Sequence, residues 1–353
     1  MGAEEFDRQT NEYNYGIAFL KAFFSFCVVC CHFWTREGRS YPASILGRMC
    51  ENAVPVFFMI SFYLSAQIFI NTDKAKMHKR FRRLIFPYFA WGFIYYFGYL
   101  ICDLILKTVG IKNGLSIDFT VRDLLWQLAF GSDRYLCPQL WFQFDLIVLT
   151  ALFWIVFRYS KKHSVRIVIA LIVMSLAFQY SGLNIRLFGA LAYEVRFSTG
   201  RIAEVLPLAC IGFLLAYTEI LKPITAHRLF CSIMCIFSMF TIASGDLFTR
   251  SEGFGYGGTY MIAYSTAVFI LFNTLSFTFL PAVAKKVIKA LSKYSLGVFC
   301  IHYGIGHRMD NLLAKTGINI NSFVKCIIIY FISLLVSRAI SIIPSKYAKQ
   351  LVS

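Results

Sequence analysis

The chain has 353 residues and a formal net charge of +17, and 58% of its residues are hydrophobic while only 15% are charged. With 37 phenylalanines and a mean hydropathy of +0.63, it is too apolar to be a soluble domain. Apolar segments recur from end to end, which predicts an all-α, polytopic membrane protein in which residues 1–353 form a single integral domain. Short basic loops beside anionic lipid would explain the positive charge, and an anionic substrate or cofactor would also use it.

The apolar segments predict about ten transmembrane helices after a polar start at residues 1–13. The connection at 107–138 is the longest polar one, and its amphipathic stretch V-R-D-L-L-W-Q-L is expected to lie at the membrane interface. The first span has no basic leader and no small-residue cleavage site, so we interpret it as a retained helix. The expected spans lie near residues 14–34, 52–70, 84–106, 139–158, 165–180, 201–217, 228–244, 258–280, 294–307 and 322–343.

Basic residues are concentrated in alternate short connections, which predicts the orientation of the chain. The densest run, N-T-D-K-A-K-M-H-K-R-F-R-R at 71–83, leads into a third helix that we expect to carry Pro87 in its first turn. Short connections rich in Lys and Arg stay on the cytosolic side of a membrane. This rule places the run inside the cell, and both the N- and C-termini are therefore expected to be cytosolic.

Two ionisable residues, Lys21 and His32, interrupt the first apolar span. Their separation turns an α-helix through roughly 1100°, so both side chains point to one face, about 16 Å apart along the axis. Ser25 lies on the same face. Ionisable groups inside a membrane are costly and usually face a partner, a cavity or a substrate path. We therefore expect this face to line a functional cavity around which the other helices pack.

Several common site motifs are missing from the sequence. There is no Walker A sequence, no G-x-G-x-x-G after a strand and no H-E-x-x-H, and nothing indicates nucleic-acid binding. Cys27 and Cys30 form a C-x-x-C, but neither a polar setting nor a second ligand pair is visible in the sequence. We interpret these cysteines as small packing residues and predict no metal site.

Four patterns occur in a fixed order along the chain. Lys21 and His32 fit a basic residue, a ten-residue gap and a histidine. V-P-V-F-F-M-I-S-F-Y-L at 54–64 resembles V-P-x-F-F-x-x-S-G-Y-L, and K-R-F-R-R-L-I-F-P-Y at 79–88 resembles an arginine-rich run ending in proline. The fourth pattern combines L-W-F at 140–142 with a late S-L-G-V-F-C-I-H that ends in His302. In this order they resemble the acyltransferase-3 family of bacterial integral membrane acyltransferases, which typically modify sugars of envelope or secreted glycans.

This resemblance extends over nearly the whole chain, with two departures. Phe62 stands where the family usually has glycine, which would narrow any close approach of backbone or ligand there, and Lys21 stands where arginine is more frequent. The resemblance implies an acyltransferase for groups other than aminoacyl groups. It would move an acyl group, most simply acetyl, from cytosolic acyl-CoA to a hydroxyl of an envelope or exported glycan, from within the bacterial inner (plasma) membrane. Its partners would be acyl-CoA, a glycan or glycolipid acceptor and membrane lipid.

The resemblance also implies roles for individual residues. His32 would be the general base or a transient acyl carrier, because the unperturbed pKa of histidine lies near neutrality; the alternative is an interfacial histidine that only hydrogen-bonds a loop. Lys21 would hold a CoA phosphate or a pantetheine carbonyl, or would form a purely structural ion pair with Asp145 or Glu204. Asp145 could equally pair with Lys21.

Two further groups of residues complete the expected site. The donor would be bound by Arg80, Arg82, Arg83, Ser61 and Tyr63, although orientation alone explains basic residues there, and Ser61 with Ser65 could serve a helix contact. The acceptor would be bound by Trp141, Asp145, Arg201, Glu204 and His302, although the charged members of this group could pair only with each other.

Two rival functions stay open at this point. The first is a transporter or exporter of polysaccharide or small molecules with the same fold. A transporter would more often show internal repeats or paired broken helices, and neither is visible in the sequence. The second is an interaction or sensor protein, in which the pair Lys21 and His32 would be degenerate, whereas both residues are intact.

Overall fold

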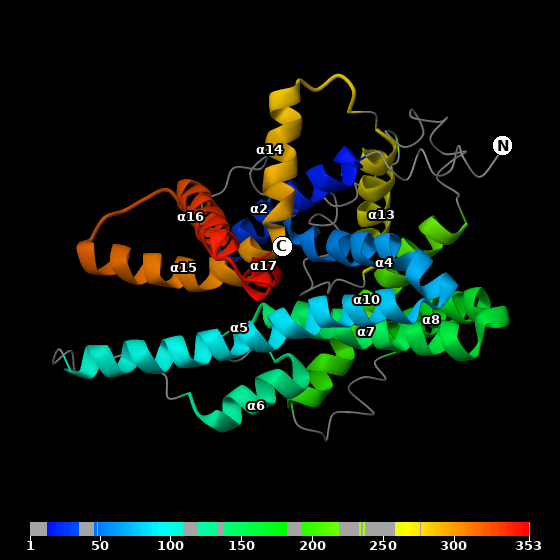
Figure 1. The fold of residues 1–353 in the computed structure, drawn as a ribbon, viewed down its shortest axis with the longest axis horizontal. Helices are drawn as coiled ribbons and strands as arrows, with labels where there is room; N and C mark the ends of the chain where they lie inside the picture. The colour runs from blue at the N-terminus through cyan, green and yellow to red at the C-terminus, as the bar shows by residue number, and fades with distance from the viewer. Residues whose placement is uncertain are drawn as a thin grey trace.

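In the computed structural model, all regular structure in the described residues is helical (Figure 1), which confirms the all-α prediction. The described residues are 13–34, 46–47, 49–108, 119–132, 137–181, 193–218, 233, 236, 258–275 and 277–352. The helices are α2 (Tyr15–Phe33), α4 (Ala53–Asn71), α5 (Lys74–Thr108), α6 (Val121–Phe130), α7 (Leu140–Tyr159), the 3₁₀ turn η1 (Lys161–His163), α8 (Ser164–Tyr180), α10 (Tyr193–Tyr217), α13 (Thr259–Thr274), α14 (Ala282–Lys293), α15 (Ser295–Thr316), α16 (Ser322–Ile342) and α17 (Lys346–Val352).

Seven helices in the described residues are long and apolar enough to cross a membrane, which agrees with a polytopic protein. The predicted span at 258–280 corresponds to α13, whose apolar part is shorter. The predicted span at 294–307 lies within α15, which is helical but not one of the seven. The predicted span at 228–244 lies almost entirely outside the described residues. The seven spans are Tyr15–Phe33, Met49–Asn71, Lys74–Ile105, Leu140–Tyr159, Lys161–Tyr180, Tyr193–Tyr217 and Ser322–Ile342.

Helix α5 differs from the sequence prediction at its start. It begins at Lys74, so most of the basic run is helical and Pro87 lies inside the helix, not in its first turn. Asp73 precedes the helix and caps its first turn, since its carboxylate accepts a hydrogen bond from the Lys76 backbone N–H at 3.0 Å. Lysine and arginine are good helix formers, and no glycine or proline separates Lys74 from the apolar part. The helix therefore continues through the charged residues.

Helices α2 and α4 lie at the centre of the bundle, where their side chains are mostly buried. Helix α4 packs closely against α10, because a Cβ at Gly212 would lie only 2.4 Å from the Met59 carbonyl oxygen. Small residues allow helix backbones to approach in this way within a membrane. Phe62, Phe69 and Phe153 form an aromatic cluster between α4 and α7. This packing fixes the position of α4 relative to its neighbours.

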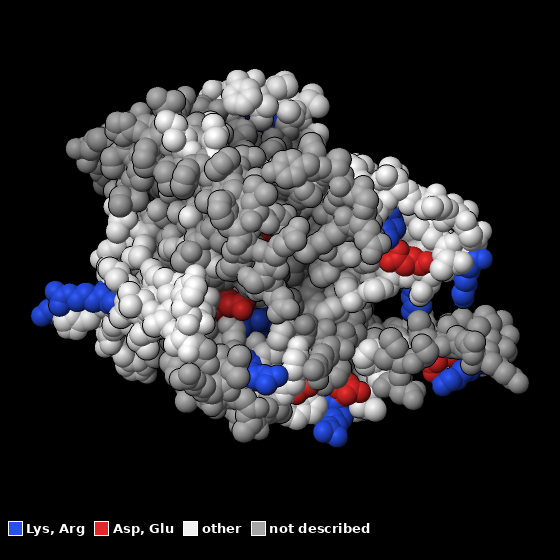
Figure 2. All heavy atoms as spheres, turned by 180° about the vertical axis from the view of Figure 1, so that it is seen from behind, with Lys and Arg blue, Asp and Glu red and all other residues white. Residues whose placement is uncertain are grey.

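The outer surface of the bundle is apolar along much of its length. On α5, Phe93, Phe97, Ile101 and Leu104 are all exposed and follow one another at helical spacing. Among the described residues on the face shown in Figure 2, Lys, Arg, Asp and Glu lie in small separate groups, with uncharged residues between them. Helix α14 runs crosswise to α5 in Figure 1. Three of its lysines, at 285, 289 and 293, recur every four residues and so lie along one side of the helix. Such a surface fits a lipid environment.

Candidate functional site

His32 lies near the end of α2, where it faces α15. Its ring centroid is 5.3 Å from that of His302 and 5.5 Å from that of Tyr303. The two helices come together because residue 306 is glycine: a Cβ there would lie 2.0 Å from the Phe33 ring. His32 is exposed, whereas His302 is completely buried. The structure thus joins the residue expected to catalyse with one expected to bind the acceptor.

The hydrogen bonds of His302 define its protonation pattern. Nδ1 lies 2.9 Å from the carbonyl oxygen of Val298, and a carbonyl oxygen only accepts, so Nδ1 carries the hydrogen. In the neutral imidazole Nε2 is then an acceptor. This Nε2 is buried and has no hydrogen-bond partner among the described residues. A buried acceptor of this kind is costly unless a partner reaches it.

Lys21 makes no hydrogen bond or ion pair with any described residue, although it is only partly exposed. The charged group that acts on it is Arg83 of α5, which is itself basic. One alternative from the sequence was an ion pair between Lys21 and Asp145. That prediction is wrong, because Asp145 pairs with Arg201. Ser25 faces α16, where its hydroxyl lies 3.4 Å from that of Tyr330.

Arg80 extends from α5 to a set of hydroxyl groups on two other helices. Its guanidinium donates to Ser61 Oγ at 3.0 Å, to Thr150 Oγ1 at 3.2 Å and to Ser65 Oγ. All three acceptors are neutral, so no carboxylate of the described residues neutralises the cation. Arg83 on the same helix adds a second positive charge beside it. Ser61 and Ser65 therefore hold the Arg80 side chain in place.

Phe62 is fully buried and packs beneath Arg80. The guanidinium carbon of Arg80 lies 5.6 Å from the centroid of the Phe62 ring and 5.8 Å from that of Phe69. Arginine is attracted to the face of an aromatic ring. The residue that replaces the usual glycine therefore fills the space that a glycine would leave, and it supports a cation there.

The remaining residues of the expected donor group are not all brought together. Arg82 and Arg83 are exposed on α5. Tyr63 faces α13, where its hydroxyl accepts a hydrogen bond from Asn273 Nδ2 at 3.0 Å, and Asn273 Oδ1 in turn accepts one from Asn14 at 2.7 Å. The structure therefore joins Ser61 with Arg80 but turns Tyr63 toward a different neighbour.

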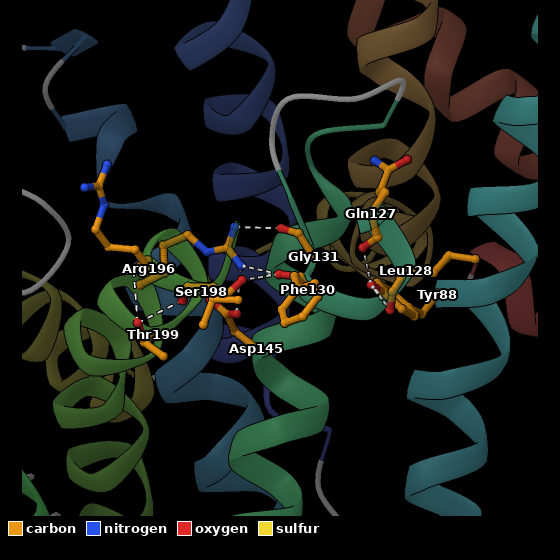
Figure 3. Close-up of polar contacts among 11 residues, drawn as sticks. Tyr88, Gln127, Leu128, Phe130, Gly131, Asp145, Arg196, Ser198 and Thr199 are labelled. Carbon is orange, nitrogen blue, oxygen red and sulfur yellow. Dashed lines mark hydrogen bonds and ion pairs between the residues drawn. The ribbon is translucent and has the colours of Figure 1, made fainter. Parts of the chain in front are cut away.

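Arg201 and Asp145 form a buried ion pair between α10 and α7. Arg201 Nη2 lies 3.1 Å from Asp145 Oδ1, and Nη1 donates to the Gly131 carbonyl oxygen at 2.7 Å, where α6 ends. Figure 3 shows Asp145, Phe130 and Gly131 lying together at this junction. A cation at a helix C-terminus also interacts favourably with the helix dipole. These two residues mainly fasten α6 to the bundle.

Aromatic rings enclose the Arg201 guanidinium, whose carbon lies 5.0 Å from the Trp141 ring centroid and 4.6 Å from that of Phe197. Trp141 is therefore part of this buried junction. Glu204 acts electrostatically on Asp145 and is partly exposed. Of the residues expected to bind the acceptor, four gather here, and His302 lies apart beside His32.

Sequence reasoning missed two polar residues next to His302. The Tyr95 hydroxyl donates to the Cys300 carbonyl oxygen at 2.7 Å and accepts from the Gly304 N–H at 3.2 Å, and Gln139 Nε2 donates to the same carbonyl at 2.8 Å. Neither residue belongs to a motif in the sequence, and tyrosine is abundant in the chain. The only signal was a glutamine next to the L-W-F pattern in an apolar span.

Among the described residues, no group of three or more His, Cys, Asp or Glu side chains could hold a metal ion.

The membrane-spanning helices and the family comparison together define an integral membrane acyltransferase. A family profile described as an acyltransferase domain matches residues 14–342, from the residue that caps α2 to the end of α16. The protein therefore belongs to the acyltransferase-3 family, as the four motifs indicated. Comparisons with curated proteins and with solved structures found no match.

Proposed function

We propose that this acyltransferase moves an acyl group, most simply acetyl, from cytosolic acyl-CoA to a hydroxyl of an envelope or exported glycan. The observation that carries the proposal is the pair of imidazoles formed by His32 and His302 at the junction of α2 and α15. Transfer from a thioester to a hydroxyl requires a base that can release its proton again, and histidine suits that task near neutral pH. The enzyme would lie in a bacterial inner membrane with both termini in the cytosol.

The donor site in this proposal is the cationic group formed by Lys21, Arg80 and Arg83. Arg83 acts as a like charge on both Lys21 and Arg80, and none of the three pairs with a carboxylate in the part of the chain that the structure describes. Bound phosphate would remove this repulsion, and the nucleotide end of CoA carries phosphates. Ser61 orients Arg80, Arg82 adds to the positive field, and Tyr63 would line the side of the site toward α13.

The reaction would take place at His32. A nitrogen of His32 takes the proton of the acceptor hydroxyl while the hydroxyl oxygen attacks the thioester carbonyl carbon. The new carbon–oxygen bond forms, the carbon–sulfur bond breaks, and the proton passes from His32 to the departing thiolate. An alternative order, in which the acyl group rests on His32 before transfer, uses the same nitrogen as nucleophile. Lys21 would hold a phosphate or the pantetheine carbonyl while this happens.

The acceptor would approach along the start of α7, which is continuous with the histidine pair. Phe142 packs against Phe299 of α15 with ring centroids 4.9 Å apart, and Phe299 packs in turn against His302. Trp141 and Glu204 would present an aromatic ring and a carboxylate to a sugar. Asp145 and Arg201 would shape this wall from behind, since their hydrogen bonds are directed mainly to each other and to α6.

The test is acyl transfer by the purified protein in lipid nanodiscs. We would incubate the protein with acetyl-CoA and an extract of envelope glycan, and follow free thiol together with labelled acetyl in the glycan. Wild type is expected to produce both, whereas His32→Ala and Lys21→Ala lose at least about 100-fold in rate. His163→Ala, which changes an exposed histidine in η1, serves as the matched control.

The results separate this proposal from its rival. If several acyl-CoA donors neither bind to nor react with the wild-type protein, while labelled glycan moves across the membrane of vesicles containing it, the protein is an exporter. If thiol release is normal in His32→Ala, acyl transfer is real but His32 is not its base. Only loss of transfer in His32→Ala, with His163→Ala unchanged, supports His32 as the base or acyl carrier.

A further inference from the structure

His302 is held in one orientation, and its second nitrogen has no partner. The ring is completely buried, Nδ1 donates to the Val298 carbonyl oxygen at 2.9 Å, and Nε2 makes no hydrogen bond within the described residues. In a folded protein, a buried acceptor with no donor is uncommon, and those that occur are often at functional sites. A donor is therefore expected to reach this nitrogen when the site works.

The ring of His32 lies beside this nitrogen and can supply the donor. The two ring centroids are 5.3 Å apart with an interplanar angle of 40°, so a modest rotation of His32 brings one of its ring N–H groups to Nε2 of His302. His32 itself makes no hydrogen bond with any described residue, so nothing yet fixes which of its nitrogens carries the hydrogen. A catalytic base normally has a third group that fixes its orientation and tautomer.

The turn of α15 that carries His302 is held by side chains from outside the helix. The Cys300 carbonyl oxygen and the Gly304 N–H lie at the two ends of this helical turn. In this turn the Tyr95 hydroxyl lies between them, bonded to both, and Gln139 donates to the same carbonyl and to the Tyr95 hydroxyl. His302 is at the middle of this turn. Side chains from α5 and the start of α7 thus fix the backbone on both sides of it.

We propose that His302 is the positioning residue of the site: its Nε2 accepts an N–H from His32 and so directs the other His32 nitrogen, free of hydrogen, toward the acceptor hydroxyl. The inference rests on the proposed function. It assigns His302 a role other than direct binding of the acceptor, and it makes the Val298 carbonyl, His302 and His32 a continuous line of hydrogen bonds. Tyr95 and Gln139 hold the turn of α15 that carries His302.

This arrangement requires no additional reactant. The acceptor hydroxyl gives its proton to the bare nitrogen of His32, which becomes positively charged while its N–H stays on His302 Nε2. The hydrogen bond from a cationic donor is stronger than from a neutral one, so His302 stabilises the transition state more than the ground state. The proton then leaves His32 with the thiolate of CoA, and both histidines return to their starting state.

Three substitutions of His302 test this role, and they differ in whether the new side chain carries a polar group and where that group lies. Gln places its amide near the position of Nε2, Asn places its amide near that of Nδ1, and Leu has no polar atom. We expect His302→Leu and His302→Asn to lower kcat for acetyl transfer about 100-fold with the KM for acetyl-CoA unchanged, since the donor cations lie elsewhere. His302→Gln is expected to recover at least about tenfold of that loss. Thermal unfolding of each variant shows whether it is folded.

A purely structural role gives a different pattern. Leu at this position removes a buried nitrogen with no partner, so the stability of His302→Leu should match or exceed that of wild type. If Leu and Gln have the same kcat, or if kcat follows the melting temperature, the inference is wrong. If wild type itself transfers no acyl group, the proposed function fails and the inference fails with it.

Tyr95→Phe gives a second test: the inference requires a lower kcat in a folded variant, and an unchanged kcat contradicts it.

Discussion

Phe62 is the residue at which this chain departs most from the motif of its family, and the structure gives it a packing role. Its ring is fully buried against Phe153 and lies beneath the Arg80 guanidinium. Phe62→Ala is expected to lower the free energy of unfolding by about 3–5 kcal/mol, because it leaves a cavity. Phe97→Ala, at a ring that is 54% exposed, should cost much less. Thermal unfolding in detergent compares the two, and equal shifts would contradict this role.

The ion pair of Arg201 and Asp145 gives a second residue-scale prediction. Both side chains are buried, so Arg201→Met leaves an unpaired carboxylate and should cost about 3–5 kcal/mol of stability. Asp145→Asn combined with Arg201→Met removes both charges and should recover part of that loss. A double-mutant cycle from unfolding measurements decides the matter. Strict additivity of the two single changes would show that the pair is not coupled.

Sequence reasoning located these residues more easily than it assigned their partners. The motifs identified Lys21, His32 and Arg80, and the intramembrane position of Asp145 indicated that it needed a partner. The partner itself could not be chosen, because Arg201 and Lys21 are both basic residues in apolar spans and only tertiary packing decides which one lies beside Asp145. Tyr95 and Gln139 were missed for the same reason, since their role depends on a turn of α15.

At the scale of elements, the contact between α2 and α15 decides whether the two histidines meet. A Cβ at Gly306 would lie 2.0 Å from the Phe33 ring, so Gly306→Ala should push the helices apart and lower acyl transfer about tenfold or more. Gly98→Ala is the control, since a Cβ there meets nothing within 4 Å and alanine favours a helix. Rates are compared at equal amounts of folded protein. Equal activity in the two variants would show that this contact does not set the site.

Hydropathy predicted most of the helices because a span must be apolar over its whole length. It was least reliable where helices continue beyond the apolar part. Helix α5 extends back to Lys74 and α15 continues to Thr316, because charged residues such as Lys and Arg favour helix as strongly as many apolar ones do. Helix α14 was not predicted as an element, since its apolar residues occupy only one side.

For the whole molecule, the question is what the net charge of +17 does besides orienting the chain. Scattered lysines would serve orientation alone, but Arg83 is close enough to act on both Lys21 and Arg80. Such a group raises the local concentration of anions and holds a phosphate once it arrives. In the proposed function that phosphate belongs to the donor, so Arg80 and Arg83 should affect the binding of acyl-CoA and not the chemical step.

A donor without phosphates tests this directly. Acetyl-pantetheine keeps the thioester and the pantetheine arm but has no phosphate for the cations to bind. Arg83→Ala is expected to raise the KM for acetyl-CoA about tenfold, because an exposed charge–phosphate contact contributes about 1–1.5 kcal/mol, and to leave the KM for acetyl-pantetheine unchanged. The KM for acetyl-CoA should also rise with salt in wild type and less so in the variant. Arg166→Ala, in α8, is the control for loss of one positive charge. If both donors respond equally to Arg83→Ala, this arginine supports the fold or the orientation of the chain, and the phosphates of CoA bind elsewhere.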